Sequence, residues 1–157
     1  PERPAAPPPR RARHSDAPEQ ELLRLAGASG DAVFALADPA LLSDPAVDDA
    51  YEALAEAGSV VDAMESLSPA AAELLGQAAV EETAAELEDV VARLLDRSAS
   101  AALDELEAEA RSSEDPLAYA TITGWLKLHI ESLRLHPDVR SEETMALRNW
   151  IIDRVAA

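Results

Sequence analysis

The chain has 157 residues, 48% of them hydrophobic, and a formal net charge of −18 at pH 7. That charge argues against a surface that binds a nucleic-acid backbone, because phosphate contacts need basic side chains. The absence of cysteine excludes disulfides and thiolate metal sites and is typical of a cytoplasmic protein. No stretch is long and apolar enough to predict a membrane span.

The chain opens with a segment rich in proline. Six prolines fall among the first 18 residues, which favours polyproline-II or irregular backbone and leaves nothing to build a core. We therefore expect residues 1–17 to be a linker. Its RRAR run (residues 10–13) could touch phosphate, although a solvated tether is the simpler interpretation. Because the chain starts without Met, we expect a piece of a longer protein.

Helical patterns begin at Pro18 and continue along the chain. The first pattern ends at Gly27 and Gly30, the next at Pro39, and a third, which starts at a Ser-Asp cap, ends at Gly58. A short helix is expected after this glycine. The following segment begins with Ser-Pro (residues 68–69), a pair typical of an N-cap and the first helical position.

No Gly or Pro interrupts the chain from Glu81 to Asp115, and this stretch predicts one long helix. Its apolar residues recur at helical spacing. They are Leu87, Val90, Val91, Leu94, Leu95, Ala102, Leu103 and Leu106. No β-type alternation of useful length occurs, so the predicted fold is all-α: a helical bundle followed by a long helix and a C-terminal helical hairpin.

Two tail helices, over residues 116–135 and 142–157, are predicted to form this hairpin around a His-Pro-Asp break. The first carries two apolar stripes. One holds Ile122, Leu126, Ile130 and Leu133 with Tyr119 beside them, and the other holds Leu117, Leu128 and Leu135. The last helix, capped by Ser141, has a wide apolar arc with Trp150 at its edge. A two-helix hairpin cannot bury both stripes, so the second needs the bundle or another protein.

The charge distribution separates the tail from the rest of the chain. Residues 21–116 carry four Arg against 23 acids, whereas residues 117–157 carry five Lys or Arg against five acids and contain both tryptophans. We expect Trp125 in the hairpin core. For Trp150, partner contact and stacking on Trp125 both remain open, because Trp beside Arg148 and Arg154 is a grouping often found at interfaces.

Residues that carry chemistry are sparse. His129 and His136 lie seven apart without a third ligand, so His129 is interpreted as a packed, hydrogen-bonded side chain and His136 as a loop residue. The acidic clusters resemble solvated helix faces more than a calcium loop. No phosphate-binding loop, nucleophile elbow or Ser/His/Asp signature is present. We expect no metal, no cofactor and no catalytic residue in this chain.

Several segments together resemble the C-terminal helicase-binding domain of bacterial DNA primase, the DnaG type. They are PEQELLRLA, LLSDPAVDDAYEALAEAG, VVARLLDRSASAALDELEAEAR and DPLAYATITGWLKLHIESLR. The resemblance covers nearly everything from Pro18 onward and is one of layout. It implies a helical bundle, here residues 18–115, and a hairpin subdomain, here residues 116–157, that docks onto the N-terminal domains of the hexameric replicative helicase. The strong acidity of the bundle is a departure from the family. The parent primase would hold its zinc-binding and polymerising modules upstream.

The resemblance implies a non-catalytic domain that couples priming to unwinding, that is a monomer alone and that binds neither membrane nor, strongly, nucleic acid. The expected partner-binding residues are Leu128, Leu135, Leu147, Arg148, Trp150, Ile151 and Arg154. Trp150→Ala or Leu147→Asp is expected to abolish docking while leaving helical content nearly intact. Alternatives are the N-terminal domain of a replicative helicase, for which self-assembly into a ring would argue, a metal-dependent hydrolase and a generic acidic scaffold.

Overall fold

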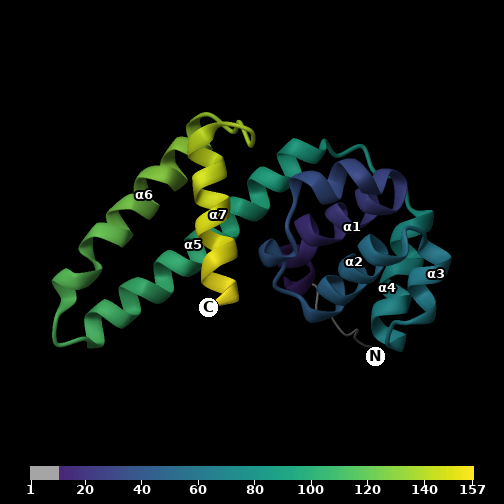
Figure 1. Cartoon of the computed structure of the whole chain (residues 1–157), viewed down its shortest axis with the longest axis horizontal. Coiled ribbons are helices and arrows are strands. Elements are labelled where there is room, and N and C mark those ends of the chain that lie inside the picture. Colours follow the sequence, from purple (N-terminus) through teal and green to yellow (C-terminus); the bar gives the residue numbers. More distant parts are fainter. Residues whose placement is uncertain (1–10) are drawn as a thin grey trace, which may run out of the picture.

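The computed structural model describes the backbone of residues 11–157 and the side chains of residues 17–157, and it confirms the all-α prediction, with no strand in this range (Figure 1). In the labels used below, η marks a 3-10 helix. The elements are α1 (Arg11–Leu36), η1 (Pro39–Leu41), α2 (Pro45–Ala57), α3 (Val60–Glu65), α4 (Pro69–Val80), α5 (Leu87–Ser112), η2 (Pro116–Tyr119), α6 (Ala120–Leu135) and α7 (Glu142–Ala156).

Side-chain caps set most helix starts. Asp44, Ser59, Ser68 and Ser141 each accept a hydrogen bond from a backbone N–H in the first turn of the helix that follows. At the other end of α2, Gly58 adopts a left-handed conformation with φ 78° and donates its N–H to a carbonyl of the last turn. The predicted caps and the glycine stop are therefore confirmed.

The first helix differs from the prediction at both ends. It begins at Arg11 and runs through Pro18, so residues 11–17 are helical in place of the expected linker, whose residues 1–10 lie outside the described residues. Residues 10–17 contain no proline, and the helix continues through Pro18, although that residue lacks the N–H for one hydrogen bond of the helix. The expected stop at the glycines is a local break at Ser29 (φ −147°, ψ 64°), after which the helix resumes.

The long helix starts later than predicted, at Leu87 instead of Glu81. The intervening residues are held by side-chain bonds to α1 that compete with helix formation. Thr83 donates its hydroxyl to Glu21 and accepts the backbone N–H of Ala85. Arg24 of α1 forms an ion pair with Glu81 at 2.8 Å. This connection therefore crosses from α4 to α5 as an extended segment.

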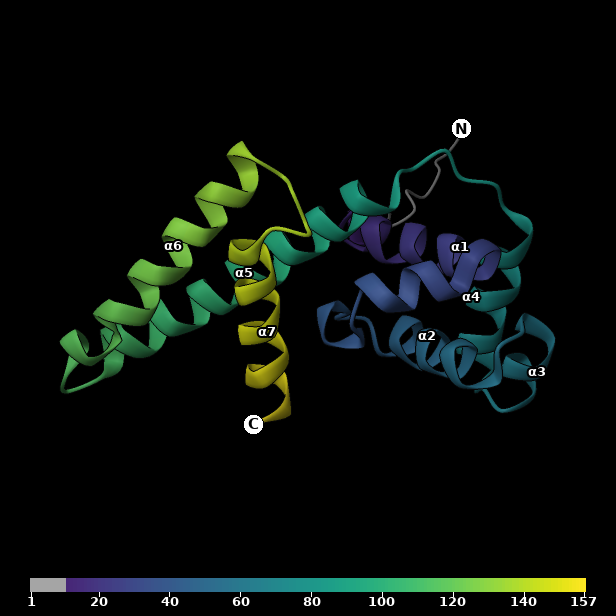
Figure 2. The same ribbon diagram turned by 45° about the horizontal axis from the view of Figure 1, so that its top comes forward.

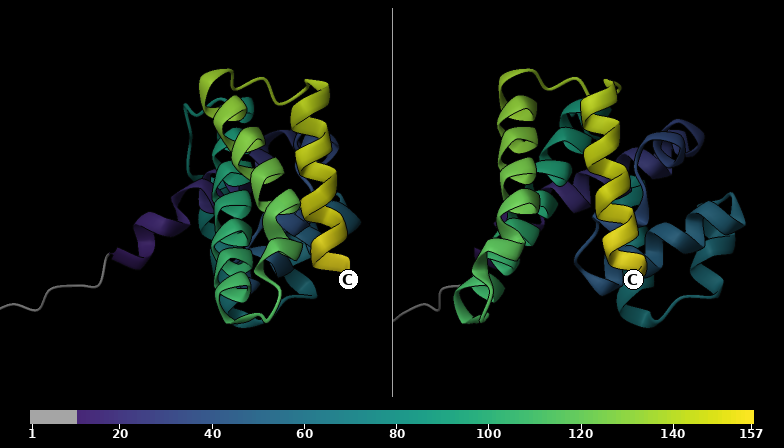
Figure 3. Two further views of the ribbon diagram at one scale, coloured as in Figure 1. Left: turned by 90° about the vertical axis from the view of Figure 1, so that its left-hand side faces the viewer. Right: turned by 60° about the vertical axis from the view of Figure 1, so that its left-hand side comes forward.

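The helices form two regions joined by α5. Helices α1 to α4 make a bundle against the N-terminal half of α5, and the other half of α5 leaves the bundle with α6 running back along it (Figures 1 and 2). We call α6, α7 and this second half of α5 the distal arm. Helix α7 crosses from α6 toward η1, so that the C-terminus lies beside the bundle (Figure 3).

The hairpin pairing differs from the one predicted. The chain reverses at η2, so α6 packs chiefly along α5, while α7 contacts α5, α6 and η1. The reversal at Pro116 coincides with the predicted boundary between residues 115 and 116, but side-chain packing crosses that boundary. One continuous core extends from Leu22 of α1 to Ile151 of α7. The physical reason is that α5 alone offers α6 a long apolar stripe.

A buried carboxylate ties the bundle together. Glu19 of α1 has 0% exposure and accepts hydrogen bonds from the Ser43 hydroxyl at 2.6 Å and from the backbone N–H of Asp44 at 3.0 Å. It also forms an ion pair with Arg97 of α5. Burial acts to raise the pKa of Glu19, but the bonds from Ser43 and Asp44 and the Arg97 charge outweigh it, so the pKa is lowered. We call these four residues the Glu19 hub.

Candidate docking surface

Helix α6 has two apolar faces, one buried and the other exposed. Its inner face, formed by Leu126, Ile130 and Leu133, is buried against α5 and α7. Leu128 and Leu135, on the opposite side, are each 68% exposed. The second leucine stripe predicted from the sequence is therefore left uncovered by the rest of the chain, because the bundle lies beyond α5 and does not reach it.

The exposed stripe continues over the length of α6 and into η2. Leu117 of η2 is 83% exposed, and no heavy atom lies within 4 Å of a Cβ placed on Gly124. We call the following set the outer α6 face: Leu117, Thr121, Gly124, Leu128, Glu131 and Leu135, all of them exposed. Their spacing alternates between three and four residues, which places them along one side of a helix.

Ion pairs to α5 fix the orientation of this face. Lys127 Nζ lies 3.0 Å from Glu107, and Arg134 forms two hydrogen bonds with Asp96, at 2.7 and 2.8 Å. The Arg134 bonds lower the pKa of Asp96 despite the opposing effect of burial. With its basic flank bonded to α5, α6 presents the leucines outward in a fixed rotation.

The two tryptophans meet where α6 and α7 pack together. The ring of Trp125 stacks on His129 with centroids 3.9 Å apart, and the Nδ1 atom of His129 lies 2.9 Å from the Trp125 carbonyl oxygen. Trp150 lies 6.1 Å from Trp125, centroid to centroid, and Arg154 lies over the Trp150 ring at 5.6 Å. The expected packed, hydrogen-bonded His129 is confirmed. Both indoles are half-buried, and Trp150 packs against Trp125 with the ring planes tilted by 48°.

Burial removes two predicted partner-binding residues from the surface. Leu147 is 0% and Ile151 is 4% exposed, because the apolar arc of α7 packs into the continuous core. The expectation that they contact a partner is therefore corrected, and Leu147→Asp would place a charge in the core and unfold α7. The remaining predicted residues divide between Leu128 and Leu135, which are accessible, and Arg148, Trp150 and Arg154, which are partly buried.

The arginines that were expected to contact a partner mainly form contacts within the chain. Arg154 pairs with Glu105 of α5 at 2.9 Å, and Arg140, expected as a rim charge, pairs with Glu88 at 3.2 Å. Arg148 points an Nη1 atom at the sulfur of Met145, 3.8 Å away, while its Nε atom is buried without a hydrogen-bond partner. The sequence analysis placed Leu117 in the second stripe but not among the expected partner-binding residues, and it did not single out Gly124, although the three- and four-residue spacing includes both.

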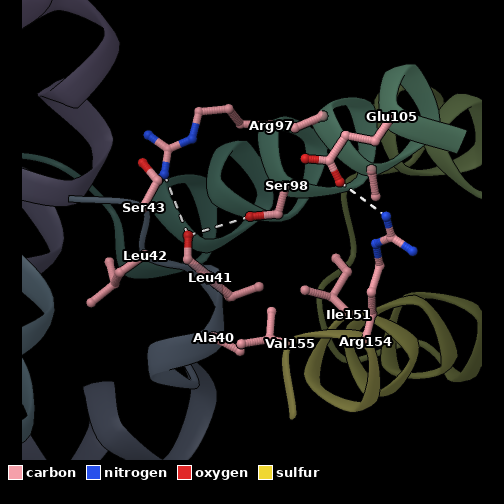
Figure 4. Close-up of a pocket in the computed structure, with 12 residues that line it drawn as sticks. Ala40, Leu41, Leu42, Ser43, Arg97, Ser98, Glu105, Ile151, Arg154 and Val155 are labelled. Atoms are coloured by element: carbon pink, nitrogen blue, oxygen red, sulfur yellow. Dashed lines mark hydrogen bonds and ion pairs between the residues drawn. The ribbon is translucent and has the colours of Figure 1, made fainter. Parts of the chain in front are cut away.

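A cleft of about 580 Å³ opens between η1, α5 and α7 (Figure 4). Its floor includes Leu41, Ile151 and Val155. Arg97 and Ser98 donate to the Leu41 carbonyl at one end, and the Arg154–Glu105 pair closes the other end. Its volume matches that of small-molecule pockets. Two of its polar lining residues, Ser43 and Arg97, are bonded to Glu19 of the hub.

The titratable groups outside the Glu19 hub include one perturbed carboxyl. Desolvation, a hydrogen bond with Glu52 and the neighbouring charges of Asp49 and Glu19 raise the pKa of Asp48 to about 7. The Asp48 carboxyl is therefore still partly protonated near neutral pH. Among the described residues, no three His, Asp or Glu side chains converge to hold a metal ion.

Comparisons with known proteins do not assign this chain to a family. No family model, no curated protein and no solved structure matches the chain. Within residues 11–157, none of the helices combines the length and the apolar character needed to cross a membrane.

Proposed function

We propose that this chain is a non-catalytic, cytoplasmic interaction domain of a DNA primase that binds the N-terminal domains of the hexameric replicative helicase through the outer α6 face. The observation that carries the proposal is the exposure of Leu128 and Leu135 on the side of α6 opposite the core. The resemblance to primase helicase-binding domains supplies the partner. Trp150, which is half-buried where α6 and α7 pack together, is a second contact.

The energetics of such a docking are ordinary for a protein interface. Burying one exposed leucine stabilises a complex by about 1.5–3 kcal/mol before the entropy of association is subtracted. Two or three leucines along α6 therefore make a compact apolar centre, surrounded by polar groups. Because a hexamer offers several equivalent sites, a primase tethered through this domain stays near unwound template even when each contact is weak.

Calorimetric titration of the chain into the cognate helicase tests this proposal. The chain is expected to bind saturably, and Leu128→Asp combined with Leu135→Asp is expected to weaken binding at least 100-fold, since a charge replaces an apolar contact at two positions. Both positions are exposed, so circular dichroism of the double variant should match the unmodified chain.

Val61→Asp is the matched control, because Val61 is a 71% exposed apolar residue on α3 at the far side of the bundle. It should bind as the unmodified chain does. Failure of the unmodified chain to bind, or equal loss in the control, would contradict the proposal and return the outer α6 face to an unassigned surface.

A further inference from the structure

The contact between the last turn of α7 and the bundle is a narrow strip between two cavities. On one side lies the cleft of about 580 Å³ (Figure 4), and on the other lies a smaller cavity of about 290 Å³. Ala40 and Leu42 of the η1 segment and Val155 of α7 line both cavities, and Val155 is itself 62% exposed. Little apolar area therefore holds this turn on the bundle, so a modest change in free energy can release it.

The smaller cavity places acids of the bundle opposite the end of α7. Its lining residues are Asp38, Pro39, Ala40, Leu42, Asp48 and Glu52 from the bundle, and Ile152, Val155 and Ala156 from α7. Among these described residues none is basic, and Arg154 of the same turn is paired with Glu105 of α5. The end of α7 therefore gives the acids of this cavity apolar neighbours and no compensating charge.

Asp48 is the acid whose charge this arrangement tolerates least. Its Oδ1 atom is buried without a hydrogen-bond partner, and a hydrogen bond between its carboxyl and that of Glu52 requires a proton on one of the two. The charged groups around it are Asp49 and Glu52 on α2, Glu19 on α1 and Asp38, which lines the same cavity. All four are acids, so an ionised Asp48 is both poorly hydrated and repelled.

We propose that the proton on Asp48 keeps the last turn of α7 against η1 and α2, and that losing this proton as the pH rises releases the turn. An ionised carboxylate needs water around both oxygen atoms. The α7 side chains form the wall of the cavity opposite Asp48, so their departure opens the cavity to solvent. Leu147 and Ile151 stay in the core, and only the last turn moves.

The direction of the pH effect follows from proton linkage. With the turn in place, the pKa of Asp48 is raised from 3.8 to about 7, whereas hydration in the released form returns the pKa toward its ordinary value. The docked form therefore holds the proton more tightly. Each pH unit between the two values weakens docking about tenfold, so docking is strongest in acid and weakest above about pH 7.

This switch is independent of the proposed function, because it concerns a contact within one chain and its test needs no partner. Glu19, the nearby acid on α1, does not take part in it, since its charge is paired with Arg97. Release of the turn would join the two cavities into one groove, because the residues that separate them belong to the contact itself.

A distance measurement between two spin labels tests the switch. The chain has no cysteine, so Asp153→Cys on α7 and Val61→Cys on α3, both exposed positions, can each carry a label. At pH 5.5 electron paramagnetic resonance is expected to give one narrow distance distribution. At pH 8.5 the distribution should broaden, and its mean should lengthen by about 5 Å, the rise of one helical turn.

Two further variants, each made in the labelled chain, separate Asp48 from other acids. Asp48→Asn cannot ionise and should keep the narrow distribution at both pH values. Asp104→Asn, which changes an exposed acid of α5, should lengthen as the unmodified labelled chain does. A lengthening that persists in Asp48→Asn would overturn the proposal, because another group would then be responsible.

The neighbouring carboxyl supplies a second check. Glu52→Gln removes the charge and the hydrogen bond that help to raise the pKa of Asp48, so less docking is lost at pH 8.5 and the lengthening should shrink. An undiminished lengthening in this variant would contradict the proposal. So would equal distances at both pH values in the labelled chain, since Asp48 would then ionise while α7 stays in place.

Discussion

The bundle and the tail (residues 117–157) differ in how their charged side chains are paired. In the bundle, Glu19 is fully buried and is satisfied by Ser43, Asp44 and Arg97 at once. Between α5 and the tail, four ion pairs lie on the surface: Glu88–Arg140, Asp96–Arg134, Glu105–Arg154 and Glu107–Lys127. Buried polar networks fix one structure, whereas exposed pairs add little stability.

The same comparison explains part of the acidity. The tail appears balanced in the sequence, with five basic and five acidic residues over 117–157. In the structure, four of those cations form ion pairs with acids of α5 and not with acids of the tail. The acidic side chains of α5 therefore bind basic side chains of the tail in the same chain. The charge balance of a stretch of sequence does not predict the charge of the surface that it forms.

Removing the centre of the Glu19 hub should have the largest effect. Glu19→Ala is expected to lower the free energy of unfolding by about 4 kcal/mol, because Arg97 and three donors, the Ser43 hydroxyl and the backbone N–H groups of Ser43 and Asp44, lose their acceptor. Urea denaturation followed by circular dichroism measures the change. Glu73→Ala, on an exposed position of α4, should alter stability by less than about 0.5 kcal/mol, and an equal loss there would contradict the distinction.

The two faces of α6 give the next largest difference. Leu126→Ala removes a fully buried side chain and should cost about 3 kcal/mol of unfolding free energy. Leu128→Ala, two residues away on the exposed face, should change it by less than about 0.5 kcal/mol. The same denaturation experiment compares them, and similar losses would mean that the outer face is covered.

Asp48 should make part of the bundle's stability depend on pH in the direction opposite to Glu19. The pKa of Asp48 is raised from 3.8 to about 7, so the folded state holds a proton that the unfolded state releases, and stability falls as pH rises from about 4 toward 7. Asp48→Asn should therefore stabilise the chain at pH 8 by roughly 1 kcal/mol and by nothing at pH 4.

Thermal melts of both forms at the two pH values measure this difference. Glu19, whose pKa is lowered, contributes stability that is present above its unfolded pKa and lost as pH falls through its folded pKa. The Asp48→Asn variant should keep this acid-side loss. A variant that is stabilised equally at pH 4 and pH 8 would show that the asparagine acts through packing instead of through the proton.

Loss of one exposed ion pair between α5 and the tail should have the smallest effect on the free energy of unfolding. Arg134→Ala removes both bonds to Asp96, yet the Arg134 side chain is 60% exposed, so a loss of about 0.5 kcal/mol is expected, and less in high salt. Thermal melts at low and high salt measure it. A loss as large as that of Glu19→Ala would remove the contrast between the two regions.

Local sequence signals predicted the helices well. Caps at Ser68 and Ser141 and the glycine stop at Gly58 are decided within a few residues, so sequence alone was sufficient. The helix over residues 11–17 and the extended segment before Leu87 were missed. The second is explained by contacts with α1 about 60 residues away, as in the bond from Thr83 to Glu21, which no local pattern contains.

The candidate surface was predicted in part. The helical spacing of the apolar residues separated the outer stripe from the inner one, and Leu128 and Leu135 are exposed as a docking role requires. Leu147 and Ile151 were wrongly expected at the surface. Because the chain reverses at η2, α6 packs along α5, and α7 then packs between α5, α6 and η1 with these two side chains in the core. Tertiary arrangement decides which of two apolar faces is buried, and the sequence pattern treats them alike.

The most direct test of the docking role is a nuclear magnetic resonance titration of the isotopically labelled chain with the helicase N-terminal domains. The outer α6 face predicts that signals of residues 117–135 and the Trp150 indole shift or broaden first, while those of α3 stay unchanged. Perturbations concentrated on the bundle, with α6 unaffected, would contradict the assignment of this face as the docking surface.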